Sequence, residues 1–158
     1  MDQLDARLIA LFTAEPRVGV LAASRRLGVA RGTVQARLDK LEHSGVIRGW
    51  GPEVDPAALG YTVTAFVTLG IRQIRGHDPL GERLAAIPEV LEVHTITGSG
   101  DLLCRVVARS NADLQRVIDA IVAVEAVERT STVIALETVV PHRVLPVVLA
   151  AAREHADE

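Results

Sequence analysis

The chain has 158 residues, 17 of them Lys or Arg and 20 Asp or Glu, with a formal net charge of −3 and 49% hydrophobic residues. This length suits one large or two small domains, and the hydrophobic content excludes a disordered tail protein. A single cysteine, Cys104, excludes a disulfide framework and a multi-cysteine zinc site. The longest apolar stretch, Val144 to Ala152, is too short to span a bilayer, and the acidic start is unlike a secretory signal, so we expect a cytoplasmic protein.

The charge is unevenly distributed along the chain. Eight basic and five acidic side chains give residues 1–50 a net charge of +3, whereas nine basic and fifteen acidic side chains give residues 51–158 a net charge of −6. A basic segment attached to an acidic body indicates that the front of the chain meets a polyanion.

Hydrophobic spacing predicts a first helix that ends at Pro16 and a short second helix from Val20 to Leu27. Gly28 follows directly and suits a left-handed helix stop with a tight turn. One face of the first helix carries Leu4, Leu8, Leu11 and Phe12. The second helix is expected to turn Leu21 and Leu27 inward and Arg25 and Arg26 outward.

A third helix is predicted from Arg31 to Gly45, with a buried stripe of Val34, Leu38 and Leu41. Its opposite face carries small, polar and basic residues, which permit close approach to another surface. Two short helices joined at a glycine, the second with such a face, are typical of a helix-turn-helix DNA-binding unit, although plain three-helix bundles share the geometry. The side chains expected to contact DNA are Arg25, Arg26, Arg31, Thr33, Gln35, Arg37 and Lys40.

The chain changes character after Gly45. Residues 46–51 form a β-like segment, which a DNA-binding wing would also require, and Pro52 and Pro56 mark a linker. Trp50, the only tryptophan, is expected to be buried or packed at a dimer interface. We therefore predict a helix-turn-helix domain over residues 1–50 and a linker over 51–60.

The remaining chain alternates strand and helix twice. The predicted strands are Tyr61–Ile71, Val90–Thr97, Leu102–Ala108 and Val127–Val140, and the predicted helices are Pro79–Ile87 and one that Asn111 caps, with Leu114, Val117, Ile118, Ile121 and Val122 in the core. Each helix drops into a strand at a valine, and this repeated β-α-β-β-α-β order is the ferredoxin-like motif. We predict an α+β fold, with a ferredoxin-like domain over residues 61–142 and a helical tail over 143–158.

Both predicted helices cover the same face of the predicted sheet. The other face also needs a cover, because a large exposed β surface is unusual on a soluble monomer. A second copy of the chain is the natural source of that cover, so we expect a homodimer that meets sheet to sheet.

The ordered motifs resemble those of the Lrp/AsnC, or feast/famine, transcriptional regulators. The segments that carry the resemblance are Leu4 to Ile9, Arg26 to Glu42, Gly45 to Gly49, Leu59 to Tyr61, Pro88 to Val90, Thr97 to Leu103 and Arg129 to Thr132. The similarity extends from about residue 4 to about residue 142, in the order of the family. It implies a winged helix-turn-helix domain joined by a linker strand to a ferredoxin-like effector and dimerisation domain.

The resemblance also implies a function. Such a protein binds double-stranded DNA sequence-specifically, forms homodimers and octamers, and responds to a small effector, usually an amino acid. We expect it to need no cofactor and no metal ion, and not to associate with a membrane. The effector-binding residues it implies are Thr97, Gly98, Ser99, Gly100 and Asp101, with Thr130, Ser131 and Thr132 beside them. Asp101 can pair with an ammonium group, or it can cap the backbone of its own turn. The family usually has a larger, often aromatic residue where this chain has Ser99 or Gly100.

Three alternatives have weaker support. An enzyme would need a compact catalytic set, and the nearest approach to one is His94 with Ser99 and Asp101. A metal sensor would need short ligand spacings, whereas the candidate ligands are scattered: His43, His77, His94, Cys104 and His142. A small-molecule-binding ferredoxin-like protein without specific DNA binding is the remaining alternative.

Overall fold

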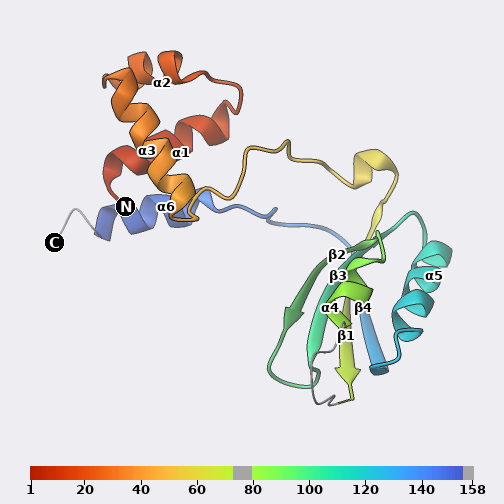
Figure 1. Ribbon diagram of the computed structural model, residues 1–158. Helices are drawn as coiled ribbons and strands as arrows, with labels where there is room; N and C mark the ends of the chain where they lie inside the picture. Colours follow the sequence, from red (N-terminus) through yellow and green to blue (C-terminus); the bar gives the residue numbers. More distant parts are fainter. Residues whose placement is uncertain (73–79, 155–158) are drawn as a thin grey trace. The chain divides into compact units, whose positions relative to one another are not determined.

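The structure, a computed structural model, describes residues 1–72 and 80–154 (Figure 1). Its elements are α1 (Gln3–Ala14), α2 (Val20–Leu27), α3 (Arg31–His43), η1 (Ala57–Leu59), β1 (Val63–Ile71), α4 (Leu80–Ala85), β2 (Val90–Thr95), β3 (Leu102–Ala108), α5 (Asn111–Val122), β4 (Val127–Ala135) and α6 (Leu145–Glu154). The chain forms two compact units, Met1–Pro52 together with the segment from Val140 onward, and Glu53–Val139. Within the described residues, no helix is both long and apolar enough to cross a bilayer.

The helical unit has a small core between its first three helices. Leu8, Ala23, Val34 and Leu38 are buried together at its centre. Helix α1 begins with a capping box, in which the Asp2 side chain accepts from the backbone N–H of Asp5 and the Asp5 side chain accepts from that of Asp2. Helix α6 packs against α1 and belongs to the same unit.

The turn between α2 and α3 has the predicted geometry. Gly28 is the C-cap of α2 and adopts the left-handed region with φ 68°, where a residue with a Cβ atom is disfavoured. Helix α3 starts after Ala30, which provides no side-chain cap. One prediction for α2 is wrong: Leu21 is half-exposed, because the buried face runs through Val20, Ala23 and Leu27, at the helical spacing from Val20.

The segment after α3 contains no strand. Residues 44–62, all of them described, contain the single 3-10 turn η1, so the linker strand predicted over residues 46–51 is not formed in this chain. Strands require a neighbouring backbone, and this segment has none beside it in one copy. Trp50 is half-exposed rather than buried; its ring packs edge-to-face on Phe12, with centroids 5.1 Å apart, and its Nε1 donates to Glu42 Oε1 at 2.7 Å.

The second unit is a four-stranded antiparallel sheet in the order β2-β3-β1-β4, with α4 and α5. Side chains of both helices pack on one face of the sheet, as the ferredoxin-like motif requires (Figure 1). The core between helices and sheet is fully aliphatic apart from Cys104, and burial raises the pKa of that thiol to about 11. The predicted fold class is therefore confirmed.

Several predicted boundaries in this unit change. Ser110, one residue earlier than predicted, caps α5 by accepting from the N–H of Asp113, because its side chain rather than that of Asn111 lies outside the first turn. Val122 is half-exposed, since it lies beyond the stripe made by Leu114, Val117 and Ile121. Strand β4 ends at Ala135, where its pairing with β1 ends, and not at Val140 as predicted. The predicted start of the α4 helix at Pro79 lies outside the described residues.

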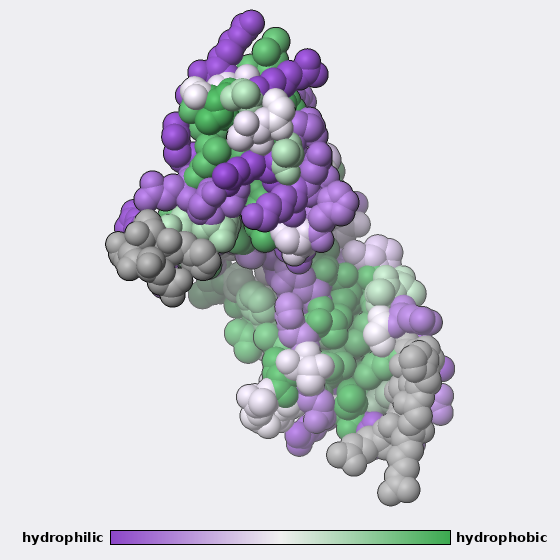
Figure 2. Space-filling view, turned by 60° about the vertical axis from the view of Figure 1, so that its left-hand side comes forward, coloured by the Kyte–Doolittle hydropathy of each residue, from purple (hydrophilic) through white to green (hydrophobic). Residues whose placement is uncertain are grey.

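The face of the sheet opposite the helices is uncovered in a single copy. The strand register places Phe66, Val133 and Arg105 together on this face, because residues paired across antiparallel strands project to the same side. Phe66 is 39% exposed and Val133 is 64% exposed. Figure 2 shows hydrophobic surface on the unit that carries the sheet.

Candidate functional site

The outer face of α3 is open to solvent. Val34, Leu38 and Leu41 are buried, so the helix presents its other side outward. The exposed residues on that side include four of the predicted DNA contacts, Arg31, Thr33, Gln35 and Lys40. Gln35 also donates from Nε2 to Asp39 Oδ1 at 2.8 Å, one turn further along the helix. The small residues Gly32 and Ala36 lie among them and leave the backbone accessible.

Arg37 differs from the other cations of α3. Its Nη1 donates to Asp5 Oδ1 at 2.8 Å and to Asp2 Oδ2, so the guanidinium holds α3 against the start of α1. The hydrogen bond from Arg37, with that from the Asp5 backbone, holds the pKa of Asp2 below its usual value, and the two carboxylates raise the pKa of Arg37. Asp5 is only 2% exposed, which makes this pair part of the helical core.

The two arginines of α2 also differ from each other. Arg26 pairs with Glu15 at the end of α1, and this hydrogen bond raises the pKa of its guanidinium. Arg25 is exposed and has no salt bridge to any residue that the structure describes. The side chains with a free charge or polar group for a partner are therefore those of Arg25, Arg31, Thr33 and Lys40.

The loop between β2 and β3 is fastened to the end of β1. Asp101 accepts from the N–H of Ile71 through Oδ2 at 2.8 Å, and its own N–H donates to Leu69 O at 2.8 Å. Gly100 packs so closely on β1 that a Cβ there would lie 2.3 Å from Thr68 Cγ2. The carboxylate of Asp101 thus caps the backbone of β1, thirty residues earlier in the chain, rather than the backbone of its own turn.

A cavity of about 330 Å³ lies beside this loop. Its lining consists of Thr68 and Gly70 from β1, Ser99 from the loop, and Arg129, Thr130 and Ser131 from β4. Three of the predicted effector residues, Ser99, Thr130 and Ser131, are thus brought together. Thr97, Gly98, Gly100, Asp101 and Thr132 do not line it.

The strand register places the side chains of β4 on alternate faces of the sheet. Thr130 and Thr132 pair with Leu69 and Val67, whose side chains are in the core, so both threonine side chains project toward the helices. Thr130 borders the cavity between Arg129 and Ser131, and Thr132 lies beyond it. Arg129 was not predicted as a site residue, although it directly precedes Thr130 and shares a strand face with Ser131, two residues further on. Thr68 was also missed, because its place beside Ser131 depends on the pairing of β1 with β4.

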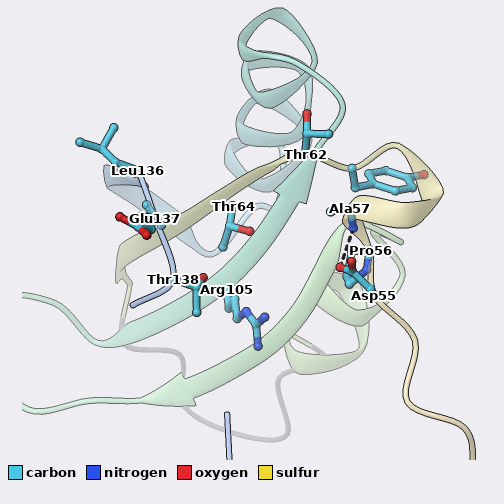
Figure 3. Close-up of a pocket in the computed structure, with 11 residues that line it drawn as sticks. Asp55, Pro56, Ala57, Thr62, Thr64, Arg105, Leu136, Glu137 and Thr138 are labelled. Atoms are coloured by element: carbon cyan, nitrogen blue, oxygen red, sulfur yellow. Dashed lines mark hydrogen bonds between the residues drawn. The ribbon is translucent and has the colours of Figure 1, made fainter. Parts of the chain in front are cut away.

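A second cavity, of about 250 Å³, lies at the other end of β1 (Figure 3). The turn at Asp55, Pro56 and Ala57 borders one side of it, and the segment Leu136–Thr138 after β4 borders the other. The Asp55 carboxylate accepts from the N–H of Ala57 at 2.9 Å, and Arg105 donates to Glu92 at 3.1 Å. None of the predicted effector residues lines this cavity.

The residues considered for metal binding do not converge. In the part of the chain that the structure describes, no group of three or more His, Cys, Asp or Glu side chains could hold a metal ion. His94 lies near Glu92 instead, with its Nε2 3.4 Å from the carboxylate, and Cys104 is buried. His77 lies outside the described residues.

The fold and its surfaces define a class of protein: a helix-turn-helix DNA-binding unit combined with a ferredoxin-like unit that contains a small polar cavity. Comparison with known families agrees with this class. The AsnC-type helix-turn-helix domain matches residues 1–42, and the Lrp/AsnC ligand binding domain matches residues 64–145. The chain belongs to the Lrp/AsnC family of transcriptional regulators.

Individual relatives match over most of their length. The chain is 30% identical to the HTH-type transcriptional regulator FL11 of Pyrococcus horikoshii, over 87% of this chain and 91% of the relative. The structure of Escherichia coli AsnC covers 92% of this chain and 99% of its own, with a TM-score of 0.83 and 26% identity. A feast or famine regulatory protein from M. tuberculosis, solved with L-methionine, covers 90% of this chain and 96% of its own, with a TM-score of 0.79 and 27% identity.

Proposed function

We propose that this regulator docks on the DNA major groove through the outer face of α3 and controls transcription in response to an amino acid. The observation that carries the proposal is the exposed polar and basic face of α3, opposite its buried stripe. A helix of this kind fits the major groove, where side chains reach base edges and cations contact phosphates.

The seven predicted DNA contacts divide into three groups. Arg25, Arg31 and Lys40 are assigned to phosphates, and Thr33 and Gln35 are assigned to base edges, because they lie on the exposed side of the helix-turn-helix. Arg26 and Arg37 are assigned a supporting role, since their guanidinium groups already pair with carboxylates in the first turn of α1 and at its two caps.

The effector is assigned to the cavity beside the loop that ends at Asp101. The support is that Ser99, Thr130 and Ser131 meet there, and that a family member from M. tuberculosis was solved with L-methionine. Thr97, Gly98, Gly100, Asp101 and Thr132 contribute indirectly, because they shape or hold the loop and strand that line the cavity. The function so assigned is non-catalytic, and it places the protein in the cytoplasm, where the DNA is.

The active oligomer in this proposal is a homodimer, in which two copies contact each other through the uncovered sheet face. Octamers are built from such dimers. The support is the exposed Phe66 and Val133 on a face that no helix covers. In this proposal residues 1–50 bind DNA, 51–60 link, 61–142 bind the effector and dimerise, and 143–158 form a tail that completes the helical unit.

The test is a titration of the purified protein onto labelled DNA from upstream of its own gene, at several salt concentrations, with a random duplex as competitor. Specific binding should exceed the control and weaken steeply with salt, and Lys40→Ala should lower the salt slope by about 1, the value for one lost phosphate contact. Arg83→Ala, which removes an exposed cation on α4, is the matched control and should change neither quantity. Binding equal to the random duplex at every salt concentration would refute a sequence-specific regulator acting at this DNA.

A further inference from the structure

The cavity beside the β2–β3 loop is polar in every side chain that lines it. Thr68, Ser99 and Ser131 bring three hydroxyl groups, Arg129 brings a guanidinium, and Gly70 brings only backbone. Thr130 also borders the cavity, but it pairs with the buried Leu69, so its side chain projects to the helix-covered face. Among the residues that the structure describes, no hydrophobic side chain lines this cavity. A ligand that filled the cavity with an apolar group would therefore remove hydroxyl groups from water without replacing their hydrogen bonds, which is costly.

Arg129 is held in place at two points. Its backbone pairs with Gly70 across the β1–β4 ladder, and its side chain lies over that glycine so closely that a Cβ at Gly70 would be 2.5 Å from Arg129 Nε. Its Nη2 donates to the carbonyl oxygen of Ser99 at 3.0 Å. The guanidinium is thus positioned at the cavity by the sheet and by the loop together.

Most of the donors of this guanidinium remain available. An arginine has five N–H donors, and the Ser99 carbonyl accepts from one nitrogen only. No carboxylate in residues 1–72 or 80–154 forms a salt bridge with Arg129. The nearby acids have other partners: Glu128 accepts from Arg72 at 3.1 Å, and Asp101 accepts from the N–H of Ile71.

We propose that Arg129 binds the carboxylate of the effector and that the hydroxyl lining selects an α-amino acid with a short polar side chain, such as serine, threonine, asparagine or glutamine. The inference rests on the proposed function, which assigns the effector to this cavity. A guanidinium is the side chain best suited to a carboxylate, because it donates two parallel hydrogen bonds. The hydroxyl groups then satisfy the polar end of the ligand and discriminate against leucine and methionine.

The first experiment measures binding of these four polar amino acids, and of leucine and methionine, to the full chain by calorimetry. At least one polar amino acid should bind about tenfold more tightly than either apolar one, since a hydrogen-bonding site strongly rejects a ligand that leaves its polar groups unpaired. Tighter binding of leucine or methionine would overturn the selectivity but leave an amino-acid effector standing. The same measurement on the other fourteen amino acids separates the two proposals: if none of the twenty binds, the proposed effector function itself fails.

The second experiment tests the role of Arg129 separately from the fold. Wild type should bind the best amino acid at least about tenfold more tightly than the analogue whose α-carboxylate is a carboxamide, because a charge-assisted hydrogen bond is then lost. Arg129→Gln should bind both compounds with nearly equal affinity, whereas a purely structural role would weaken both in proportion and keep their ratio. Arg72→Gln, which removes a neighbouring exposed arginine paired with Glu128, should keep the wild-type ratio.

Two results complete the test. Gly70→Ala should reproduce the loss shown by Arg129→Gln, because the added methyl group would displace the arginine side chain. Thermal unfolding of each variant would verify that the fold is retained. A wild-type ratio in folded Arg129→Gln would refute the carboxylate assignment.

Discussion

At the residue scale, the arginines of the helix-turn-helix divide by what they touch and not by where they stand in the motif. Arg31 and Arg37 are six residues apart on α3, and both were predicted to contact DNA. Arg31 is exposed, whereas Arg37 bonds to Asp2 and to the buried Asp5. The same side-chain chemistry therefore serves an external surface at one position and the packing of two helices at the other.

This division predicts opposite outcomes for two single substitutions. Arg37→Ala should lower the free energy of unfolding of the helical unit by about 1–3 kcal/mol, because the Asp5 carboxylate then stays buried without its charged partner. Arg31→Ala should leave stability within about 0.5 kcal/mol and lower DNA affinity with a shallower salt dependence. Thermal denaturation and salt-dependent DNA titration of both variants measure this; equal loss of stability in both would contradict it.

At the element scale, the α2–α3 turn depends on a backbone conformation and the α3 surface depends on the absence of side chains. Gly28 has φ 68°, yet a Cβ at this position would meet no atom within 4 Å. Gly32 lies on the exposed face of α3 with helical geometry, and a Cβ there would also meet no atom. Both glycines therefore have room for a Cβ atom, but only Gly28 has a backbone conformation that disfavours one.

Alanine at each position should separate the two effects. Gly28→Ala should cost about 1–2 kcal/mol of stability, since only the left-handed backbone penalises it. Gly32→Ala should gain up to about 1 kcal/mol from helix propensity, but should weaken DNA binding because the methyl group stands on the docking face. Chemical denaturation measures the stability of both variants, and DNA titration measures the affinity of Gly32→Ala. An unchanged stability of Gly28→Ala would contradict the backbone penalty at this turn.

In the ferredoxin-like unit, a residue of the β2–β3 loop caps the end of strand β1. The end of β1 has its N–H group at Ile71 capped by the Asp101 carboxylate from the loop after β2. That contact fastens the loop that contains Ser99 to β1, and it uses the carboxylate of a residue predicted to bind the effector. Its role therefore depends on pairing between strands and on no local motif.

At the scale of the whole molecule, each of the two units has its own hydrophobic core, and α4 and α5, the described helices of the sheet's own unit, both leave the same face of the sheet open. A single copy exposes Phe66 and Val133 there, next to Arg105 and Thr64 in the strand register. Exposed apolar patches of this kind mark association surfaces. A dimer formed through this face would also carry two helix-turn-helix units, which suits a pseudo-palindromic DNA site.

We predict that Val133→Asp makes the protein monomeric and lowers its affinity for a two-half-site DNA by about 100-fold or more, because linked half-sites act through effective concentration. Val122→Asp is the matched control: Val122 is also half-exposed, but it belongs to α5, on the helix-covered side. It should leave the dimer and DNA binding unchanged. Analytical ultracentrifugation measures the mass; a dimeric Val133→Asp variant would place the interface elsewhere.

The features that depend on local spacing could be predicted from the amino-acid sequence. The stripe of Val34, Leu38 and Leu41 predicted α3, Gly28 predicted the turn before it, and the alternation of apolar and polar residues over 61–71 predicted β1, because a helix or strand repeats its faces at a known interval. The order of these elements then predicted the fold class, and the resemblance of the ordered motifs indicated the family.

Tertiary contacts determine which side chains are available to bind DNA or the effector. Arg37 is taken by acids more than thirty residues earlier in the chain, and Arg129 reaches the cavity through its pairing with Gly70 and its bond to Ser99. The same holds for Asp101, whose carboxylate is used by β1. Such contacts join residues that are distant in sequence, and their partners are chosen by strand register and helix packing, which local spacing does not specify.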